Sequence, residues 1–235
     1  MKNQAVLITG AAKRLGMALT RKSLAMGFSV LAHYRSSKEE LEQWLEAHPD
    51  ERSKVHFMQA ELTTETGALM ARIDKLPVKL VGLVNNASVY ARGSIDEAER
   101  FNALIDTNAF VPLLLAREFR KRARAGWIIN ITDAHIDAIN HEYQSYRIAK
   151  KLLGEFTMQL ASLYAPDLRV NAVAPGAMLP APGQSPEVFD RLSTRIPLGR
   201  TGSFEDLWRA YEYLVKSDYV TGQVLYVDGG WHLRV

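Results

Sequence analysis

The sequence predicts a single α/β domain, residues 1–235, built on a doubly wound parallel sheet of about seven strands. Three observations lead to this prediction. Short apolar runs of strand length alternate with longer helical patterns along the whole chain. Most of these runs lack polar alternation, as expected for strands covered by helices on both faces of a sheet. The length allows one large core, and the absence of cysteine excludes a disulfide scaffold and a catalytic thiol.

Seven apolar runs are the expected strands: Ala5–Thr9, Phe28–Tyr34, Val55–Ala60, Leu80–Asn85, Trp127–Thr132, Leu168–Val173 and Val224–Val227. Segments rich in Leu, Ala, Glu, Lys and Arg predict helices between them, at Ser37–Ala47, Asp96–Arg122 and Tyr146–Tyr164. Ser37 is the expected N-cap of the first helix, with Glu40 three residues on. Such an alternation implies right-handed crossovers and a ligand site outside the carboxyl ends of the strands.

One connection, at about residues 175–200, is long and contains five prolines. A loop of that length in a compact domain is usually a lid or a binding loop, so we expect it to cover the substrate.

Charge and hydropathy exclude several classes of partner. A net charge of +3 is too small to indicate a nucleic-acid protein. The basic cluster around residues 117–124 lies at a predicted helix C-terminus without interleaved aromatics, which indicates a solvated helix end. No apolar run approaches the ~18 residues of a membrane helix, and no signal peptide is apparent, so we expect a cytoplasmic protein. His135 and His141 lack the spacing of metal ligands, and no metal is expected.

A turn of small residues follows the first apolar run: Thr9-Gly10-Ala11-Ala12-Lys13-Arg14-Leu15-Gly16. Such a turn lets backbone N–H groups approach a pyrophosphate at the N-terminus of a helix, so Gly10, Leu15 and Gly16 are candidate cofactor-binding residues. The glycine fingerprint is incomplete, because Arg14 stands where a middle glycine is usual. An ordinary turn between a strand and a helix is the alternative.

The end of the second run favours NADPH over NADH. A site for NADH usually has Asp or Glu about 20 residues beyond the glycines, where it binds the ribose hydroxyls. Here the run ends His33-Tyr34-Arg35-Ser36-Ser37-Lys38, with no carboxylate before Glu39. We expect a 2′-phosphate to meet Arg35, Arg14 and two hydroxyls, that of Ser36 among them. A solvated basic loop is the alternative.

Tyr146 and Lys150 lie one turn apart on the same face of a predicted helix. A nearby ammonium favours the phenolate, so Lys150 is expected to lower the tyrosine pKa from its reference value near ~10. The phenol would then donate a proton at neutral pH. By itself this spacing is weak, and it gains value because it opens the helix after the fifth expected strand.

In order and spacing, five groups of residues resemble the short-chain dehydrogenase/reductase family over essentially the whole chain. They are Thr9–Gly16, Asn85–Ala87, Tyr146 with Lys150, Asn171–Gly176, and Thr221–Gly222 with Asp228–Gly230. The resemblance implies a Rossmann fold that is usually assembled as a homotetramer. It also implies that Tyr146 and Lys150 contact the nicotinamide ribose and that Asn108 supports the lysine through water. Pro175 and Gly176 would pass beside the nicotinamide.

The same resemblance gives cofactor contacts to Asn86 and Ala87, for which a self-satisfied strand-end turn is the alternative. Glu61 stands where the family more often has an aspartate near the adenine. Contact there would come from Glu61 or from the backbone of Leu62.

Two departures narrow the resemblance to the pteridine reductases and the related bacterial dihydromonapterin reductases. About thirteen residues before the tyrosine the family commonly has a serine that donates to a substrate carbonyl, and here that residue is Asp133. Arg14 is also unusual for generic ketone reductases. In the resembled group, Ser88 and the aromatic residue just beyond it, here Tyr90, line the pterin pocket.

The expected function is therefore NADPH-dependent reduction of a dihydropterin, dihydromonapterin or dihydrobiopterin-like, with dihydrofolate as a weaker substrate. An ionised carboxylate repels a ketone oxygen, whereas a pterin offers ring nitrogens and N–H groups. Asp133 and Tyr146 would deliver the proton, directly or through water, and Tyr90 would stack on the pterin. This interpretation requires the carboxylate of Asp133 within reach of the hydroxyl of Tyr146.

Three alternatives stay open. Asp133 could cap a turn while Thr132 serves as the carbonyl donor of a 3-oxoacyl or other ketone reductase. Tyr90 could be a partly buried loop aromatic. Finally, the chain could be a non-catalytic NADP-binding protein on the same fold, since fold does not fix function.

Overall fold

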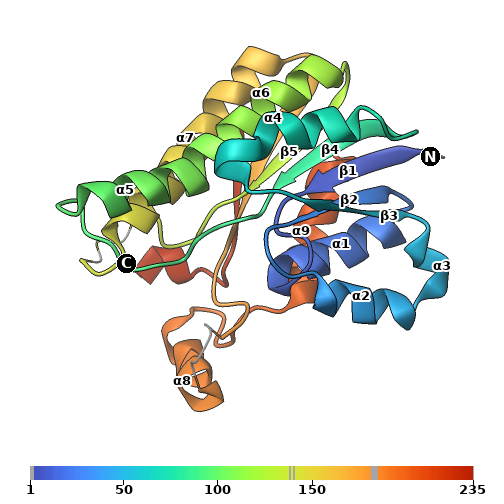
Figure 1. The fold of residues 1–235 in the computed structure, drawn as a ribbon. Coiled ribbons are helices and arrows are strands. Elements are labelled where there is room, and N and C mark those ends of the chain that lie inside the picture. Colours follow the sequence, from blue (N-terminus) through green and yellow to red (C-terminus); the bar gives the residue numbers. More distant parts are fainter. Residues whose placement is uncertain (1–2, 138, 140, 181–184, 235) are drawn as a thin grey trace.

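Seven parallel strands form one sheet in a computed structural model that describes residues 3–137, 139, 141–180 and 185–234 (Figure 1). The strand order is β3-β2-β1-β4-β5-β6-β7. The strands are β1 Gln4–Ile8, β2 Ser29–Tyr34, β3 Val55–Gln59, β4 Lys79–Asn85, β5 Gly126–Ile131, β6 Leu168–Pro175 and β7 Val224–Val227. All seven predicted strands are present, and none of their ends differs from the prediction by more than two residues. The doubly wound α/β prediction is confirmed.

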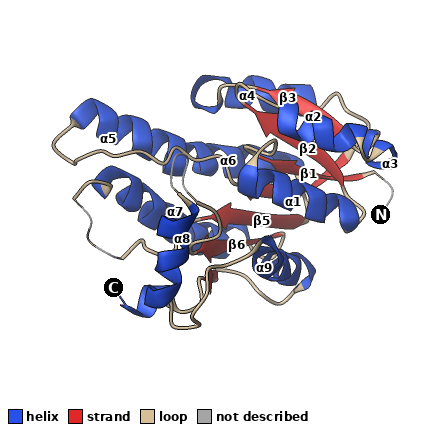
Figure 2. Ribbon diagram, turned by 90° about the horizontal axis from the view of Figure 1, so that it is seen from below, coloured by secondary structure: helices blue, strands red, loops and turns tan. Residues whose placement is uncertain are grey.

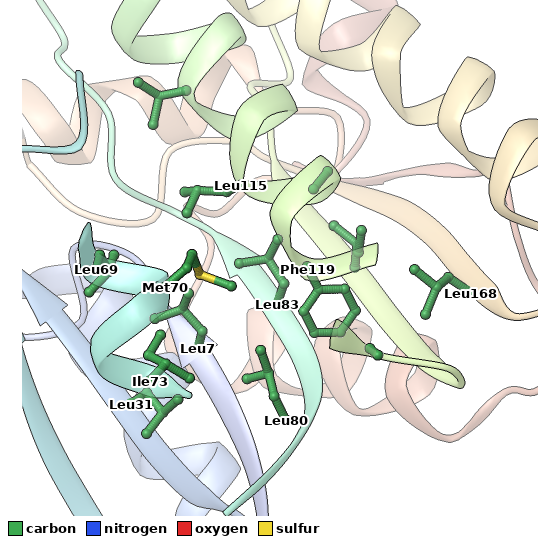
Figure 3. Close-up of a cluster of buried hydrophobic side chains, with 14 of the residues drawn as sticks. Leu7, Leu31, Leu69, Met70, Ile73, Leu80, Leu83, Leu115, Phe119 and Leu168 are labelled. Atoms are coloured by element: carbon green, nitrogen blue, oxygen red, sulfur yellow. The ribbon is translucent and has the colours of Figure 1, made fainter. Parts of the chain in front are cut away.

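Helices cover both faces of the sheet (Figures 1 and 2). The described helices are α1 Arg14–Ala25, α2 Glu39–Glu46, α3 Pro49–Arg52, α4 Leu62–Ile73, α5 Ala98–Ile105, α6 Val111–Arg122, α7 Gln144–Tyr164, α8 Pro186–Arg191 and α9 Phe204–Lys216. Helices α4, α6 and α7 pack on one face, where Leu69, Phe119 and Leu160 belong to one buried cluster (Figure 3). Helices α1, α2 and α9 pack on the other face, around Leu19, Leu41 and Leu207.

The ends of these helices follow local rules in some places and depart from the predictions in others. Helix α9 begins with a capping box, in which the Ser203 hydroxyl accepts from the Asp206 amide and the Asp206 carboxylate accepts from the Ser203 amide. The predicted Ser37 cap is wrong. Helix α2 begins two residues later, after Lys38, because the Ser37 hydroxyl donates to the side chain of Glu39 and caps no backbone N–H.

The single helix predicted over Asp96–Arg122 is divided by a π-helical turn, Asp106–Phe110, between α5 and α6. Pro112 supplies a reason. It has no N–H to donate to the carbonyl of Asn108 four residues earlier, and the Val111 amide donates five residues back, to Asp106. The turn places Asn108 inside the protein, with no exposed surface.

The chain reverses its direction of winding between β1 and β4, which are neighbours in the sheet. In an open α/β sheet ligands bind at such a switch point, outside the carboxyl ends of the strands. The first turn, the residues after β4 and the residues after β5 all lie at this edge.

The predicted substrate loop at about 175–200 is only partly irregular. It contains α8 and a 3-10 turn, Leu192–Arg195, and α8 stands away from the sheet in Figure 1. Residues 181–184 of this segment lie outside the described residues. Among the described residues, no helix is long and apolar enough to cross a membrane.

Candidate active site

Two adjoining hollows lie at the carboxyl edge of the sheet. The first, of about 300 Å³, extends from the first turn to the ends of β2 and β3. The second, of about 380 Å³, extends from the same turn to the ends of β4, β5 and β6. Gly10, Lys13, Ala87 and Ser88 border both hollows, so a long ligand could occupy both.

The first turn needs glycine at both ends of its motif. Gly10 has a φ of +62°, which L side chains rarely adopt, and a Cβ added at Gly16 would lie 1.9 Å from the Gly10 carbonyl oxygen. The Asn86 amide group donates to the carbonyls of Thr9 and Gly10, at 2.9 and 3.2 Å. The Thr9 hydroxyl oxygen accepts from the backbone amides of Asn86 and Ala87, at 2.9 Å each. The turn after β1 is thereby fixed to the end of β4.

Arg35, Ser36, Glu61 and Leu62 line the first hollow, as the sequence predicts for one end of a dinucleotide site. The Arg35 guanidinium lies 4.0 Å from the Glu61 carboxylate and is two-thirds exposed. The Glu61 side chain caps α4 by accepting from the backbone amide of Thr63. Lys13 lies in the same hollow and adds a second cation near Arg35.

Arg14 lies on the side of the second hollow and is absent from the lining of the first. Its guanidinium donates to the carbonyl of Pro180 at 2.8 Å, and its backbone has a φ of +49°. The prediction that Arg14 and Arg35 meet the same 2′-phosphate does not fit this structure, in which the two side chains border different hollows. Arg14 is bound to the segment after β6, and Lys13 is the other cation that lines the hollow of Arg35.

Asp133, Tyr146 and Lys150 lie together in the second hollow. The Tyr146 hydroxyl donates to Oδ2 of Asp133 at 3.1 Å, and the amide of His135 donates to Oδ1 at 2.7 Å. The requirement that the carboxylate and the phenol meet is thus satisfied. The Lys150 ammonium donates to the carbonyl of Ile131, at the end of β5, at 2.8 Å. Its nitrogen is 5.9 Å from the centre of the Tyr146 ring.

Burial controls the protonation of this group. Desolvation raises the pKa of Tyr146 well above its usual value, and the charge and hydrogen bond of Asp133 raise it further. Desolvation lowers the pKa of Lys150 to about 8, against the opposing effect of Asp133. The expectation that Lys150 lowers the tyrosine pKa is therefore wrong here, because the phenol is buried and a carboxylate is in direct contact with it. The arrangement keeps Tyr146 protonated at neutral pH.

The side chain of Asn108 is hydrogen-bonded to the loop after β4. Its Oδ1 accepts from the Ser88 hydroxyl and from the amide of Val89, both at 2.8 Å, and its Nδ2 donates to the carbonyl of Val89 at 3.0 Å. The side chain thus fixes the position of Ser88 at the border of both hollows. The water-mediated support of Lys150 stays a prediction. The backbone carbonyl of Asn108, to which Pro112 has no N–H to donate, is suited to it.

Tyr90 borders the second hollow and is 57% exposed. Its ring is parallel to that of Tyr143, with centroids 4.7 Å apart, and it meets the Tyr146 ring edge to face at 4.9 Å. Because Tyr143 covers one face, a planar ligand could stack only on the opposite face of Tyr90.

Pro175, the last residue of β6, and the following Gly176 lie in the wall of the second hollow, which Leu15 also lines. Glycine is required at 176 by packing, because an added Cβ would lie 2.7 Å from the Cβ of Asp228. The sequence explains this residue by the approach of a nicotinamide, whereas the structure gives a second reason that holds without any ligand.

These features fit a nicotinamide dinucleotide. The turn from Gly10 to Gly16 packs its own backbone closely only because neither glycine has a Cβ. A turn of this kind lets backbone N–H groups approach a pyrophosphate at a helix N-terminus. Lys13 and Arg35 provide charge for a phosphate in the first hollow, and Lys150 and Tyr146 provide polar groups in the second. Among the described residues, no group of three or more His, Asp or Glu side chains could hold a metal ion.

Sequence reasoning missed three residues at this site. Thr9 and Lys13 flank the glycine turn, and their position immediately beside Gly10 and Arg14 was an available signal. Tyr143, the N-cap residue of α7, lies three residues before Tyr146, a spacing that brings side chains to the same side of a helix. Its stacking on Tyr90 depends on a loop some fifty residues away in sequence, which no local pattern indicates.

Comparison with known proteins agrees with this geometry. Residues 10–232 match the profile of the family described as enoyl-(acyl carrier protein) reductase. The chain is 32% identical to 3beta-hydroxysteroid dehydrogenase 1 of Eggerthella lenta, over 99% of this chain and 95% of that one. It is 27% identical to the 3-oxoacyl-[acyl-carrier-protein] reductase FabG of Staphylococcus aureus, over 98% of each.

Among solved structures, the chain is similar to FolM alternative dihydrofolate reductase 1 of Brucella suis, in complex with NADP. The TM-score is 0.91, with 31% identity over 98% of this chain and 96% of that one. The corresponding Brucella canis protein, also with NADP, gives the same TM-score and identity, over 98% and 94%.

Proposed function

This chain belongs to the short-chain dehydrogenase/reductase family, and from that premise we propose that it uses NADPH to reduce a dihydropterin to a tetrahydropterin. Dihydromonapterin and dihydrobiopterin-like compounds are the proposed substrates, with dihydrofolate, which has the same bicyclic head, as a further one. The observation that carries the proposal is the hydrogen bond from the Tyr146 hydroxyl to the Asp133 carboxylate.

A carboxylate at this position selects the chemistry of the substrate. A ketone oxygen needs hydrogen-bond donors, and an ionised Asp133 would repel it. A pterin presents N–H groups beside the C=N bond to be reduced, and a carboxylate can accept hydrogen bonds from them. Asp133 therefore favours a nitrogen heterocycle over a ketone.

NADPH held between the first turn and Lys150 would supply a hydride for the ring carbon of the C=N bond, and the neighbouring ring nitrogen would need a proton. Tyr146 holds that proton, because burial and Asp133 keep its pKa high. The increasing basicity of the nitrogen as the hydride arrives draws the proton from the phenol. Lys150, charged below a pKa of about 8, then stabilises the phenolate. Asp133 fixes the direction of the hydroxyl and accepts an N–H of the substrate.

The rest of the pocket holds the substrate flat. Ser88 is fixed by Asn108, and Tyr90 is supported from behind by Tyr143, so that its opposite face can stack on the pterin. NADPH rather than NADH is proposed because Arg35, Lys13 and Ser36 line the first hollow. The neighbouring Brucella structures, which hold NADP and are described as alternative dihydrofolate reductases, support both parts of the proposal.

A ketone reductase is the second candidate, favoured by the similarity to the steroid dehydrogenase and to FabG. It would need Thr132 as its carbonyl donor. The Thr132 hydroxyl donates to the carbonyl of Val173 at 3.2 Å, and the residue is 3% exposed. Because this hydroxyl already donates to a backbone carbonyl and is buried, it is poorly placed to bind a substrate, which weakens the ketone candidate.

The test is NADPH oxidation, followed by absorbance, with dihydromonapterin, dihydrobiopterin, dihydrofolate and a 3-oxoacyl thioester in parallel. We expect turnover with the dihydropterins, slower turnover with dihydrofolate and little with the thioester. Turnover confined to the thioester would assign the ketone reaction, and binding of NADPH without turnover of any compound would indicate a non-catalytic protein.

We also propose that the chain assembles as a homotetramer. Phe110, Leu114 and Met158, on or next to α6 and α7, are each more than two-fifths exposed, which supports burial of this surface against another copy. Light scattering after size-exclusion chromatography gives the mass directly, and a monomer at micromolar concentration would contradict the assembly.

A further inference from the structure

His33, near the end of β2, is buried between three strand ends and is 2% exposed. The backbone amide of Gly10, in the turn after β1, donates to Nδ1 of His33 at 3.1 Å. Nε2 of the same ring lies 3.1 Å from the carbonyl oxygen of Ala60, just after β3. The ring also borders the first hollow. One imidazole therefore connects the glycine turn with the other side of that hollow.

These two contacts determine the state of the ring. A backbone amide can only donate, so Nδ1 must present its lone pair to Gly10. Nε2 then carries the hydrogen and donates to the carbonyl of Ala60. If Nδ1 were also protonated, its N–H would face the N–H of Gly10, and neither group could accept a hydrogen bond. The contacts therefore require a neutral imidazole with its hydrogen on Nε2.

The contact fixes a peptide group that the cofactor site depends on. The peptide group that joins Thr9 to Gly10 is held on its N–H side by His33 and on its carbonyl side by the Asn86 side chain, which donates to Thr9 at 2.9 Å. The carbonyl of Gly10, in the next peptide group, also accepts from Asn86, at 3.2 Å. Rotation of the Thr9–Gly10 peptide would therefore move the backbone of Gly10, which borders both hollows.

We propose that His33 is a positioning residue for the cofactor, whose neutral imidazole fixes the Gly10 peptide so that dinucleotide affinity, and not turnover, depends on it. The inference rests on the proposed function only in naming NADPH as the ligand. The inference goes beyond the proposed function because it makes NADPH affinity depend on the protonation of His33, a residue with no part in the reaction.

The direction of the pH dependence follows from the surroundings of the ring. Burial lowers the pKa of His33 below its usual 6.5, while the Ala60 carbonyl and Glu61 oppose the change and Arg72 adds to it. The Gly10 contact is therefore intact at pH 7 and is lost as the pH falls through the His33 pKa, below 6.5. NADPH affinity should fall over the same range.

Two substitutions separate the contacts. In His33→Asn the amide oxygen can occupy the place of Nδ1 and accept from Gly10, but the side chain is too short to reach Ala60. In His33→Gln the amide nitrogen can occupy the place of Nε2 and donate to Ala60, and the acceptor for Gly10 is lost. His56→Asn, on the neighbouring β3, is the matched control.

NADPH dissociation constants would be measured by fluorescence at pH 7.5, without substrate. We expect His33→Gln to weaken binding about tenfold, a loss of ~1.4 kcal/mol, and His33→Asn by less than about threefold. The control should be unchanged, and turnover at saturating NADPH should stay within about twofold for all. Equal weakening by Asn and Gln, in step with their melting temperatures, would reduce His33 to a structural residue and overturn the inference.

The pH dependence is read as the ratio of wild-type to His33→Asn dissociation constants between pH 5 and pH 7.5, which cancels the ionisation of the 2′-phosphate. We expect the ratio to rise as the pH falls, and a flat ratio would contradict the inference. Should the variants fail to fold, ¹⁵N-histidine spectra of the wild type decide: hydrogen on Nδ1 of His33 at pH 7 overturns it. A protein that binds NADPH but reduces no pterin would end the proposed function and leave this inference standing.

Discussion

The two hollows of the site are built in different ways. The first is shaped mainly by backbone, with a left-handed glycine and side-chain amides that fix its turn, and its charged groups are exposed. The second is shaped by buried side chains, with Tyr146 7% and Lys150 2% exposed and the pKa values of both displaced by burial. Binding is thus assigned to rigid backbone and solvated charge, and proton transfer to desolvated groups. Substitutions in the first hollow should therefore weaken cofactor binding, and substitutions in the second should lower the rate of turnover.

The largest effect is expected for Tyr146→Phe. Removal of the proton donor should lower kcat for a dihydropterin by about 10²–10⁴-fold, the usual scale for a general acid. The NADPH dissociation constant should stay within about threefold, because the first hollow is untouched. Stopped-flow turnover and fluorescence titration measure the two quantities. Retention of a tenth of the activity would show that another group supplies the proton.

Asp133→Ala comes next, with an expected loss of about 10²-fold in kcat/KM for a dihydropterin. The carboxylate orients the phenol and accepts from the substrate, and both functions are lost. Thr132→Ala is the matched comparison in the adjacent residue. A ketone reductase would show the opposite order, with Asp133→Ala nearly as active as the wild type.

The pH profile follows the buried lysine. Lys150 is charged below its pKa of about 8 and neutral above it, so kcat should be level near neutrality and fall above about pH 8. The fall should approach about tenfold per pH unit, as for loss of a single essential proton. In Asp133→Asn the fall in kcat should begin at a lower pH, because Asp133 raises the pKa of both Lys150 and Tyr146. A fall in kcat at the same pH as in the wild type would show that Asp133 does not control these pKa values.

Arg35→Ala tests the first hollow. Loss of a charge-assisted contact with the 2′-phosphate should weaken NADPH about tenfold or more, while the affinity for NADH and kcat at saturation hardly change. Lys13→Ala should have the same sign, and Arg14→Ala should not change the preference between NADPH and NADH, because Arg14 lies in the second hollow. Equal weakening of both dinucleotides by Arg35→Ala would argue against a phosphate at this position.

The smallest effect is expected for Tyr90→Leu. Loss of one stacking face should raise KM for a dihydropterin by about 2–10-fold, with NADPH affinity unchanged. Tyr219→Leu, at a fully exposed tyrosine distant in sequence, is the control. A fall in kcat with constant KM would indicate instead that Tyr90 acts through its contact with Tyr146.

Much of this description could be predicted from the sequence because it depends on neighbours along the chain. The strands follow from apolar runs, and the pairing of Tyr146 with Lys150 follows from helical spacing. The position of Arg14 could not be predicted, because it depends on a left-handed backbone and on Pro180, far along the chain. The direction of the Tyr146 pKa was wrong for a related reason. Its cause is burial, together with a carboxylate in the loop after β5, which a residue count cannot reveal.

By itself, the sequence determined the order of the elements, the sheet edge at which they meet and the residue types that gather there. Periodicity and turn chemistry act over a few residues, and a chain carries that information in one dimension. Only the tertiary structure decided which groups meet: Lys13 in the same hollow as Arg35, Tyr143 stacked on Tyr90, and His33 between Gly10 and Ala60. Hydrogen bonds, stacking and desolvation act over a few ångströms, so the chemistry of the site depends on contacts between segments that are distant in sequence.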